Sequence, residues 1–340
     1  MPLFPNPLES VAFRLSVVPP MLADYFGVLG FHSLVAGARL GVFDALPASA
    51  DDLAAKLQLD PRGTHALLRS LTGLGYLRVR RGRYHPTRPA RLWLRTDSPS
   101  CLVEGFDFWE RSATALWANL DKTIRTGQPA TSFYALTEND PELSRSFQAW
   151  TAALARRQGP AIARAIRVHR DARDVLDVGG SHTIHSTELL RLHPSLHATI
   201  IDLPEALNSA VIEEPFRSRI TLWPASFLEA DLGEGYDVAL LFNIVHGLSD
   251  AEAADLLARV AKALNPGGTI VVGDQFRGAT AGRASRTLLD LLDLNYLLAI
   301  GGRIRTYPEV AAMLADAGFA GVRHRRPLRS PATELVVARR

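Results

Sequence analysis

Residues 174–181 read Asp174-Val175-Leu176-Asp177-Val178-Gly179-Gly180-Ser181, a short apolar run that ends in two glycines. The pattern predicts a buried strand that turns directly into a helix, where glycines let the backbone approach a ligand. A second apolar run follows and ends in Asp202, where a carboxylate can accept hydrogen bonds from two ribose hydroxyls. The stretch therefore predicts a ribose-containing ligand at the carboxyl ends of parallel strands.

Strand and helix patterns alternate from residue 169 to residue 340. Predicted strands cover 175–178, 198–202, 220–223, 238–242 and 269–272, and predicted helices cover 186–192, 205–211 and 250–264. Residues 321–326 are expected to pair with 334–338 as a closing hairpin. Pro266-Gly267-Gly268 is expected to close the last of these helices. Repeated strand–helix units specify an α/β, doubly wound, mostly parallel sheet, and we take 169–340 as one domain.

Residues 1–100 predict a mainly α domain with a winged-helix topology. Asp60 and Pro61 supply a helix cap and a first helical residue, and a tight Arg81-Gly82 turn joins two short strands. Residues 101–168 predict a helical linker that is rich in aromatic residues and suited to a pocket for a flat apolar molecule. The chain therefore divides into three parts.

Composition limits the class of protein. The 340 residues are 47% hydrophobic and 21% charged with a net charge of +3, which excludes a disordered chain. Cys101 is the single cysteine, so no internal disulfide can form, and no secretory signal is evident at the start. We expect a cytoplasmic protein.

Charged and proline residues interrupt the apolar stretch 17–42, which argues against a membrane-spanning helix. We expect no membrane partner. The stretch instead predicts a helix that is buried against protein, with a second subunit as one candidate.

The winged helix leaves two interpretations open. A DNA reader would place Arg62, His65 and Arg69 in a major groove and the arginines of the wing on phosphates. An oligomerisation domain can use the same topology. We favour the second interpretation and expect no nucleic acid partner, because the exposed helix face offers few groups that read bases.

The loop at Gly179 lacks the glycine pattern of a nicotinamide site, since it reads Gly-Gly-Ser-His-Thr-Ile over residues 179–184. An acidic residue two positions before the first glycine instead resembles the S-adenosylmethionine site of class I methyltransferases. The likeness spans nearly the whole chain, which resembles the plant caffeate-type and bacterial small-molecule O-methyltransferases. Its further motifs are Asp202-Leu203-Pro204, residues 241–250, Pro266-Gly267-Gly268 and residues 301–306.

The resemblance implies a homodimer formed through the N-terminal domain and a Rossmann-like catalytic domain. It implies S-adenosylmethionine as the cofactor, with S-adenosylhomocysteine as the product. The methylated group would be a hydroxyl of an aromatic or polyketide-like small molecule in secondary metabolism. The cofactor-binding residues that it implies are Asp177, Gly179, Gly180, Asp202, Leu203, Ser226, Phe227 and Asn243.

The resemblance also assigns the reaction chemistry. His246 follows the fourth strand and would remove the proton of the acceptor hydroxyl, with Asp274 orienting its imidazole. No metal is expected, although His182 and His185 lie three residues apart. The candidate acceptor-pocket residues are Trp109, Phe147, Trp150, Asn295 and Tyr296.

Four positions depart from the family pattern. Thr183 replaces a glycine and Ser226 a carboxylate of the cofactor site, and both should weaken cofactor binding. Gly247 and Ile304 replace acids near the base, which should leave His246 supported from one side only. These departures keep two alternatives open: the same fold with hydroxylation, decarboxylation or cyclisation chemistry, and a degenerate binding or regulatory protein.

Overall fold

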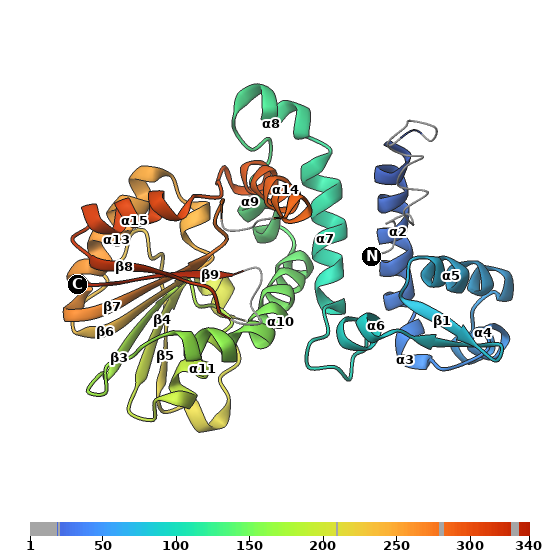
Figure 1. Cartoon of the computed structure of the whole chain (residues 1–340), viewed down its shortest axis with the longest axis horizontal. Helices are drawn as coiled ribbons and strands as arrows, with labels where there is room; N and C mark the ends of the chain where they lie inside the picture. The colour runs from blue at the N-terminus through green and yellow to red at the C-terminus, as the bar shows by residue number, and fades with distance from the viewer. Residues whose placement is uncertain (1–18, 20, 209, 279–281, 328–332) are drawn as a thin grey trace. The chain divides into compact units, whose positions relative to one another are not determined.

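The computed structural model describes residues 19, 21–208, 210–278, 282–327 and 333–340. The chain forms two compact units, Met1–Glu110 and Arg111–Arg340. Figure 1 shows the helices and strands of both units with their labels.

The first unit is a winged helix, as the sequence predicts. Its helices are α2 (Met21–Arg39), α3 (Val42–Ala45), α4 (Ala50–Leu57), α5 (Pro61–Gly73), α6 (Arg88–Trp93) and η1 (Val103–Gly105). The strands β1 (Leu77–Arg80) and β2 (Arg83–Pro86) form a hairpin between α5 and α6. The last residues of the unit belong to α7 (Phe106–Ser112), which continues past Glu110. The Asp60 side chain accepts a hydrogen bond from the Gly63 amide and Pro61 opens α5, which confirms the predicted cap.

The helix predicted to be buried within 17–42 is largely exposed in the single chain. Only Leu34, Val35 and Gly37 of α2 are buried. Its large exposed apolar side chains, 38% to 66% accessible, are Met21, Leu22, Tyr25, Phe26, Val28 and Leu29. In the described residues α2 is the one helix whose length and composition would allow it to cross a membrane, a test that a helix covered by another protein also passes.

The second unit begins with helices and continues as an α/β sheet. Its helices before the sheet are the π-turn η2 (Ala113–Trp117), α8 (Leu120–Thr126), α9 (Phe133–Glu138) and α10 (Pro141–Ala165). The strands are β3 (Asp174–Val178), β4 (His197–Asp202), β5 (Ile220–Pro224), β6 (Tyr236–Phe242), β7 (Leu264–Asp274), β8 (Ala320–Arg325) and β9 (Glu334–Arg339).

The strands form one sheet in the order β5-β4-β3-β6-β7-β9-β8 (Figure 1). The first five strands are parallel, and β9 and β8 run antiparallel at one edge, so the predicted sheet and closing hairpin are confirmed. The connecting helices are α11 (Ile184–Leu192), α12 (Pro204–Leu207), η3 (Glu214–Phe216), η4 (Val245–Gly247), α13 (Asp250–Ala263), α14 (Arg283–Ile300) and α15 (Tyr307–Asp316).

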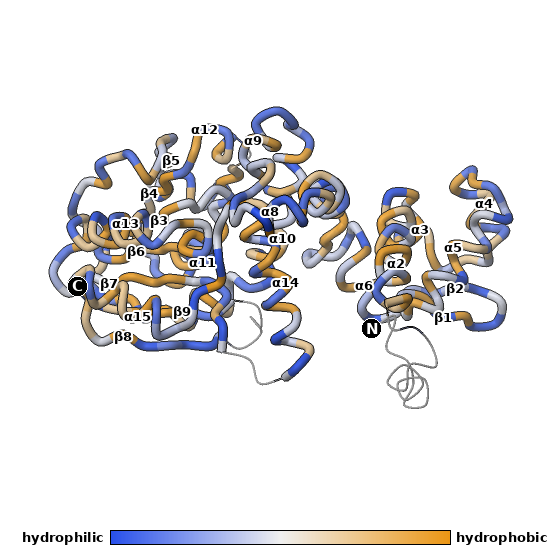
Figure 2. The backbone as a smooth tube through the Cα atoms, turned by 90° about the horizontal axis from the view of Figure 1, so that it is seen from above, coloured by the Kyte–Doolittle hydropathy of each residue, from blue (hydrophilic) through white to orange (hydrophobic). Residues whose placement is uncertain are grey.

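Both faces of the sheet are covered, as the continuous apolar runs 238–242 of β6 and 270–272 of β7 indicate. Leu240 and Val271 face the cluster that includes α10 and α11, whereas Leu241 and Val272 face the cluster of α13 and α15. Side chains alternate along a strand, so continuous apolar runs are expected for strands buried on two sides. Figure 2 shows the apolar colouring of these strands.

Two predicted boundaries are wrong. The helix expected over 205–211 is only the four residues of α12, in which Leu207 alone is buried, so little packing could stabilise further turns. The segment Pro266-Gly267-Gly268 does not close α13. It lies inside β7, which begins at Leu264 because that residue pairs with Tyr236 of β6.

Candidate active site

The carboxyl ends of β4, β3, β6 and β7 lie side by side in the sheet. The chain leaves β3 toward β4 on one side, and β6 lies on the other side, so the connections diverge between β3 and β6. Ligands of doubly wound sheets bind at this kind of switch point. Asp202 ends β4 and Asp274 ends β7, while Gly179 and Asn243 each follow a strand directly.

The glycine loop after β3 has no room for side chains. Gly179 has φ of +73°, and a Cβ there would lie 2.2 Å from Cδ1 of Ile244. A Cβ on Gly180 would lie 2.5 Å from the carboxylate of Asp177. The ring of Phe227 borders the same point, 3.7 Å from the Cβ position of Gly179. The two glycines therefore keep a bare stretch of backbone between β3 and α11.

Asp177 is fully buried below this loop. Its Oδ2 accepts a hydrogen bond from Ser186 Oγ at 2.6 Å, and its Oδ1 is buried without a partner among the described residues. Burial raises the pKa of Asp177 to about 7, helped by the charge of Asp202 and opposed by the Ser186 hydrogen bond. A buried carboxyl oxygen with an unmet hydrogen bond suits a polar ligand.

Asp202 is held in place by backbone amides. Its Oδ2 accepts from the Ser181 amide at 3.1 Å and its Oδ1 from the Leu203 amide at 2.8 Å. Burial raises the pKa of Asp202 to about 6, although both amides favour the charged form. Ser181 Oγ also donates to Gln148 Oε1 of α10 at 2.9 Å, which ties the loop to that helix.

Thr183 takes the conformation that a glycine would supply. Its φ is +60°, a left-handed value that costs a non-glycine residue about 1 kcal/mol or more. The side chain points away from the glycines and donates from Oγ1 to the Val211 carbonyl at 2.8 Å. The β-branched side chain therefore leaves the backbone path of the loop intact.

The two histidines of this loop are structural. Their rings lie 5.3 Å apart, and the His185 ring stacks on Phe242 at 4.0 Å. Burial, together with the charge of Arg156, lowers the pKa of His182 to about 4. Burial also lowers the pKa of His185 well below its ordinary value, with His182 adding to the effect. Across the described residues, no group of three or more His, Cys, Asp or Glu side chains could hold a metal ion.

Three other predicted cofactor residues also lie near this edge of the sheet. Leu203 follows Asp202 and is 40% exposed, and Ser226 follows β5, with its carbonyl accepting from the Ala230 amide at 2.9 Å. Asn243 follows β6 with φ of +56°, and its side-chain oxygen accepts from Gln275 Nε2 at 3.1 Å. Gln275 directly follows β7, so this contact bridges two strand ends.

His246 and Asp274 form a close pair. The Nδ1 atom of His246 lies 2.8 Å from Oδ1 of Asp274, and the His246 amide donates to Oδ2 at 3.2 Å. An ionised carboxylate only accepts, so Nδ1 carries the proton that is shared with Asp274. In the neutral imidazole Nε2 then keeps its lone pair. This arrangement can accept a proton from a hydroxyl group placed next to Nε2.

Tyr296 covers one face of the imidazole. The two rings are parallel within 2°, with centroids 4.0 Å apart. The Tyr296 hydroxyl donates to Gln275 Oε1 at 2.6 Å. Burial, and then the charge of Asp274, raises the pKa of Tyr296 well above its ordinary value, so the hydroxyl stays a donor. Among the described residues Asp274 is the one side chain that hydrogen-bonds the His246 ring, as the missing second acid predicts, and the Tyr296 ring packs on one face of the imidazole.

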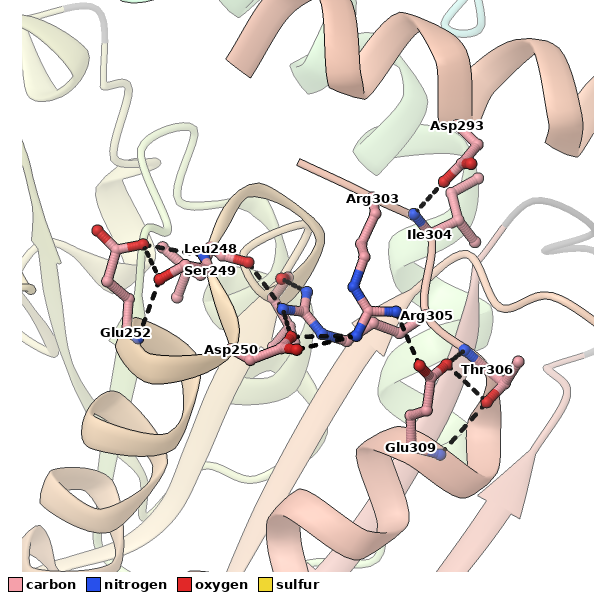
Figure 3. A network of polar contacts seen from close by, with 11 residues as sticks. Leu248, Ser249, Asp250, Glu252, Asp293, Arg303, Ile304, Arg305, Thr306 and Glu309 are labelled. Atoms are coloured by element: carbon pink, nitrogen blue, oxygen red, sulfur yellow. Dashed lines mark hydrogen bonds and ion pairs between the residues drawn. The ribbon is translucent and has the colours of Figure 1, made fainter. Parts of the chain in front are cut away.

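A buried arginine fixes the loop that carries His246 (Figure 3). The guanidinium of Arg305 donates to the Val245 carbonyl, to the Leu248 carbonyl at 2.7 Å and to Oδ1 of Asp250 at 2.7 Å. Its neighbour Arg303 donates from its backbone amide to the His246 carbonyl at 2.9 Å. We call the segment 302–305 the clamp, since it holds the loop 245–250 from one side.

Position 304 has a structural role within this clamp. The Ile304 side chain is buried, and its amide donates to Oδ1 of Asp293 at 2.5 Å (Figure 3). Asp293 also pairs with Arg277 at 2.5 Å. A Cβ at Gly302 would lie 2.2 Å from the His246 carbonyl oxygen, so only glycine permits this approach.

The predicted acceptor-pocket residues divide into three groups. Asn295 and Tyr296 lie on α14, and Asn295 Oδ1 accepts from Trp117 Nε1 at 3.0 Å. Phe147 and Trp150 lie on α10, where the Phe147 ring meets Phe133 edge-on at 4.9 Å. Trp109 belongs to the first unit and packs 4.9 Å from Phe108. Among these residues only Tyr296 has a described contact with His246.

Three residues that make contacts in this site were given no role from the sequence. Gln275 joins Asn243 to Tyr296, Gln148 accepts from the glycine loop, and Arg305 anchors the His246 loop. Gln275 had a signal, because it directly follows Asp274 at a strand end. Arg305 lies in the motif 301–306, which carries the family resemblance but gave this residue no role. Gln148 had no signal that spacing reveals, since it reaches the loop from α10.

Comparison with known proteins identifies the family. The O-methyltransferase domain model matches residues 117–320, and the O-methyltransferase dimerisation domain model matches residues 25–96. O-demethylpuromycin-O-methyltransferase of Streptomyces alboniger is 30% identical over 344 residues, covering 95% of this chain and 89% of that protein. The chain belongs to the O-methyltransferase family.

Two further similar proteins extend the comparison. The 3-hydroxy-5-methyl-1-naphthoate 3-O-methyltransferase of Streptomyces sahachiroi is 29% identical and covers 94% of each chain. The crystal structure of human N-acetylserotonin methyltransferase in complex with SAM superposes with a TM-score of 0.81 at 23% identity, covering 100% of this chain and 99% of that one. The predicted family, fold class and enzyme class are confirmed, and S-adenosylmethionine is confirmed as the cofactor used with this fold.

Replacing Arg305 should destabilise this O-methyltransferase far more than replacing Arg303. Both side chains pair with Asp250, but Arg305 is 2% exposed and Arg303 is 44% exposed. Arg305→Met leaves two inward-facing carbonyls without donors, and we expect it to lower the free energy of unfolding by about 2–4 kcal/mol. Arg303→Met should cost less than about 1 kcal/mol. Urea denaturation followed by tryptophan fluorescence measures both; equal losses would contradict the clamp.

Proposed function

We propose that this enzyme transfers the methyl group of S-adenosylmethionine to a hydroxyl of an aromatic or polyketide-like small molecule in secondary metabolism. The observation that carries the proposal is the His246–Asp274 pair at the end of β7, beside the glycine loop and Asp202. The similar proteins support it, since one is named for methylating a naphthoate hydroxyl and another for methylating a puromycin precursor.

The residues at the end of β3 and β4 suit the cofactor. Gly179 and Gly180 leave backbone that side chains cannot occupy, and the buried Oδ1 of Asp177 lacks a partner in the described part of the chain. Asp202 would accept from the ribose hydroxyls, with Leu203 and Phe227 beside the adenine. When bound, S-adenosylmethionine supplies an activated methyl carbon for displacement by oxygen. Ser226 and Asn243 complete our proposed cofactor set.

His246 would accept the proton of the acceptor hydroxyl at Nε2. A phenol with a pKa near 10 is about three units from ionisation at neutral pH, which amounts to about 4 kcal/mol. An imidazole titrates near neutral pH and can take this proton as the new bond forms. Asp274 would stabilise the positive charge that develops on the ring, and Tyr296 would hold the ring plane while Nε2 faces the acceptor.

The acceptor would lie between α14 and the aromatic residues of α10. We propose that Asn295, Tyr296, Phe147 and Trp150 line this pocket. The fifth predicted residue, Trp109, belongs to the first unit. A flat apolar acceptor suits these side chains because aromatic rings pack well against one another.

Replacing His246 tests the reaction. His246→Ala should lower turnover of a hydroxyl acceptor by roughly a hundredfold or more, because the base is lost. S-adenosylmethionine affinity should stay near that of the wild type, which serves as the folding control. Mass spectrometry with CD3-labelled cofactor would record one CD3 group per product. A product that gains oxygen or loses CO2 instead would favour the alternative chemistries, and unchanged turnover would show that His246 is not the base.

Cofactor affinity should depend on the charge of Asp202. An ionised carboxylate accepts from both ribose hydroxyls, and the pKa of Asp202 is raised to about 6, so protonation below that value removes an acceptor. Between pH 7.5 and pH 5 we expect about tenfold weaker binding of S-adenosylmethionine in calorimetry. Asp202→Asn should bind weakly with a smaller pH dependence. Equal pH dependence in both proteins would rule out this role for Asp202.

We propose a homodimer through the first unit and a cytoplasmic location. The dimerisation domain model covers residues 25–96, and the exposed apolar face of α2 is the kind of surface that a second copy buries. Sedimentation of the full chain should give twice the monomer mass of 37.1 kDa. A monomer at micromolar concentration would contradict the dimer and leave α2 open to another partner.

A further inference from the structure

A basic groove lies on the sheet far from the proposed active site. Its strand residues come from β8, β9 and the first part of β7, on the face shared with α10 and α11. Thr269 pairs with Arg339 and Arg323 with Val337, so their side chains project from the same face. Thr269 precedes Asp274 by five residues on β7, about 17 Å along the strand.

Four arginines line this groove, which has a volume of about 300 Å³. Arg323 and Arg325 come from β8, Arg339 from β9, and Arg167 from the segment after α10. In the part of the chain that the structure describes, none of the four side chains makes an ion pair or a hydrogen bond. Four like charges around one small cavity repel one another, so an anion there would be stabilising.

Arg325 and Thr269 bring polar groups to the groove. The Nε atom of Arg325 is buried and makes no hydrogen bond to any residue that the structure describes. The Thr269 side chain is 7% exposed, and its hydroxyl makes no side-chain hydrogen bond to the described residues. Buried donors in native proteins are nearly always satisfied, so the Arg325 Nε points to a ligand that accepts hydrogen bonds. Thr269 lines the same groove and adds a hydroxyl to it.

The carboxylate of Glu334, which is close in sequence to the groove arginines, lies on the opposite face of the sheet. Glu334 begins β9 and pairs with His324, and also with Arg326 at 3.3 Å. Both histidine and glutamate occupy positions that alternate with the groove residues, so they project away from it. Arginines on an edge strand can simply discourage sheet-to-sheet association, but that role needs neither a buried Nε nor Arg167 from outside the sheet.

We propose that this groove binds a diphosphate group. Guanidinium groups match phosphate oxygens with two parallel hydrogen bonds. Two linked phosphates carry more negative charge than a single phosphate, so a diphosphate matches four arginines better than a monophosphate does. S-adenosylmethionine contains no phosphate, so the ligand of the groove is a different molecule, either inorganic diphosphate or a nucleoside diphosphate.

Calorimetry of the full chain with inorganic pyrophosphate tests the proposal. The titration is run at 0.15 M NaCl with a chelator, so that screening is physiological and metal complexes are absent. We expect saturable binding at one site per chain. Arg323→Gln/Arg339→Gln should weaken it by about tenfold or more, since two charged hydrogen-bond donors are lost.

A matched control removes the same charge elsewhere. Arg62→Gln/Arg69→Gln alters two exposed arginines of α5 and should leave pyrophosphate affinity unchanged. Arg167→Gln is a second groove variant outside the sheet, so a folding defect in the strand variant cannot hide the result. Thermal unfolding of each variant checks the fold.

The ligand series distinguishes the sources. Weaker binding of monophosphate than of pyrophosphate supports the diphosphate, and tighter binding of ADP than of pyrophosphate assigns the groove to a nucleotide. No saturable pyrophosphate binding to the wild type, equal losses in the groove and α5 variants, or binding of duplex DNA without pyrophosphate binding would each overturn the proposal. None of these outcomes depends on methyl transfer.

Discussion

The register between β6 and β7 is the constraint on which the site depends. Phe242 pairs with Gly273, and a Cβ on Gly273 would lie 2.2 Å from the Phe242 ring, so the glycine admits that ring. Asp274 follows at the strand end and meets the loop that carries His246. A slip of one residue would turn the Asp274 carboxylate to the other face and break the pair with the imidazole.

Buried charge is concentrated along the same edge of the sheet. Burial raises the pKa of Asp177 to about 7 and of Asp202 to about 6, and Asp274 is nearly inaccessible. Carboxyl groups held in such surroundings are costly unless they serve a ligand or a partner. Asp274 has its partner in His246, whereas Asp177 and Asp202 belong to the proposed cofactor site. The buried carboxyl groups that cost stability are therefore the same groups that the proposed function uses.

Local patterns predicted the elements of this site, and tertiary contacts supplied the rest. The strand ends near Asp202 and Asp274 are predicted by apolar runs that stop at polar residues, glycine or proline. The stacking of Tyr296 on His246 and the reach of Arg305 to the loop 245–250 depend on how α14 and the clamp pack, which no spacing encodes. Spacing also does not reveal the hydrogen bond from the Thr183 hydroxyl to the Val211 carbonyl, which holds this residue at the start of α11. The exposure of α2 in the single chain could not be predicted from hydrophobicity. An apolar helix face indicates burial against protein, whether that protein is the same chain or a second copy.

The protonation of His246 is the most direct test of this account. Long-range ¹H–¹⁵N NMR of the imidazoles, at a pH where they are neutral and with His246→Ala to assign the signal, reports which ring nitrogen carries hydrogen. The account predicts hydrogen on Nδ1, facing Asp274, and a free lone pair on Nε2. Hydrogen on Nε2 would contradict it, because the ring could then accept no proton from an acceptor hydroxyl.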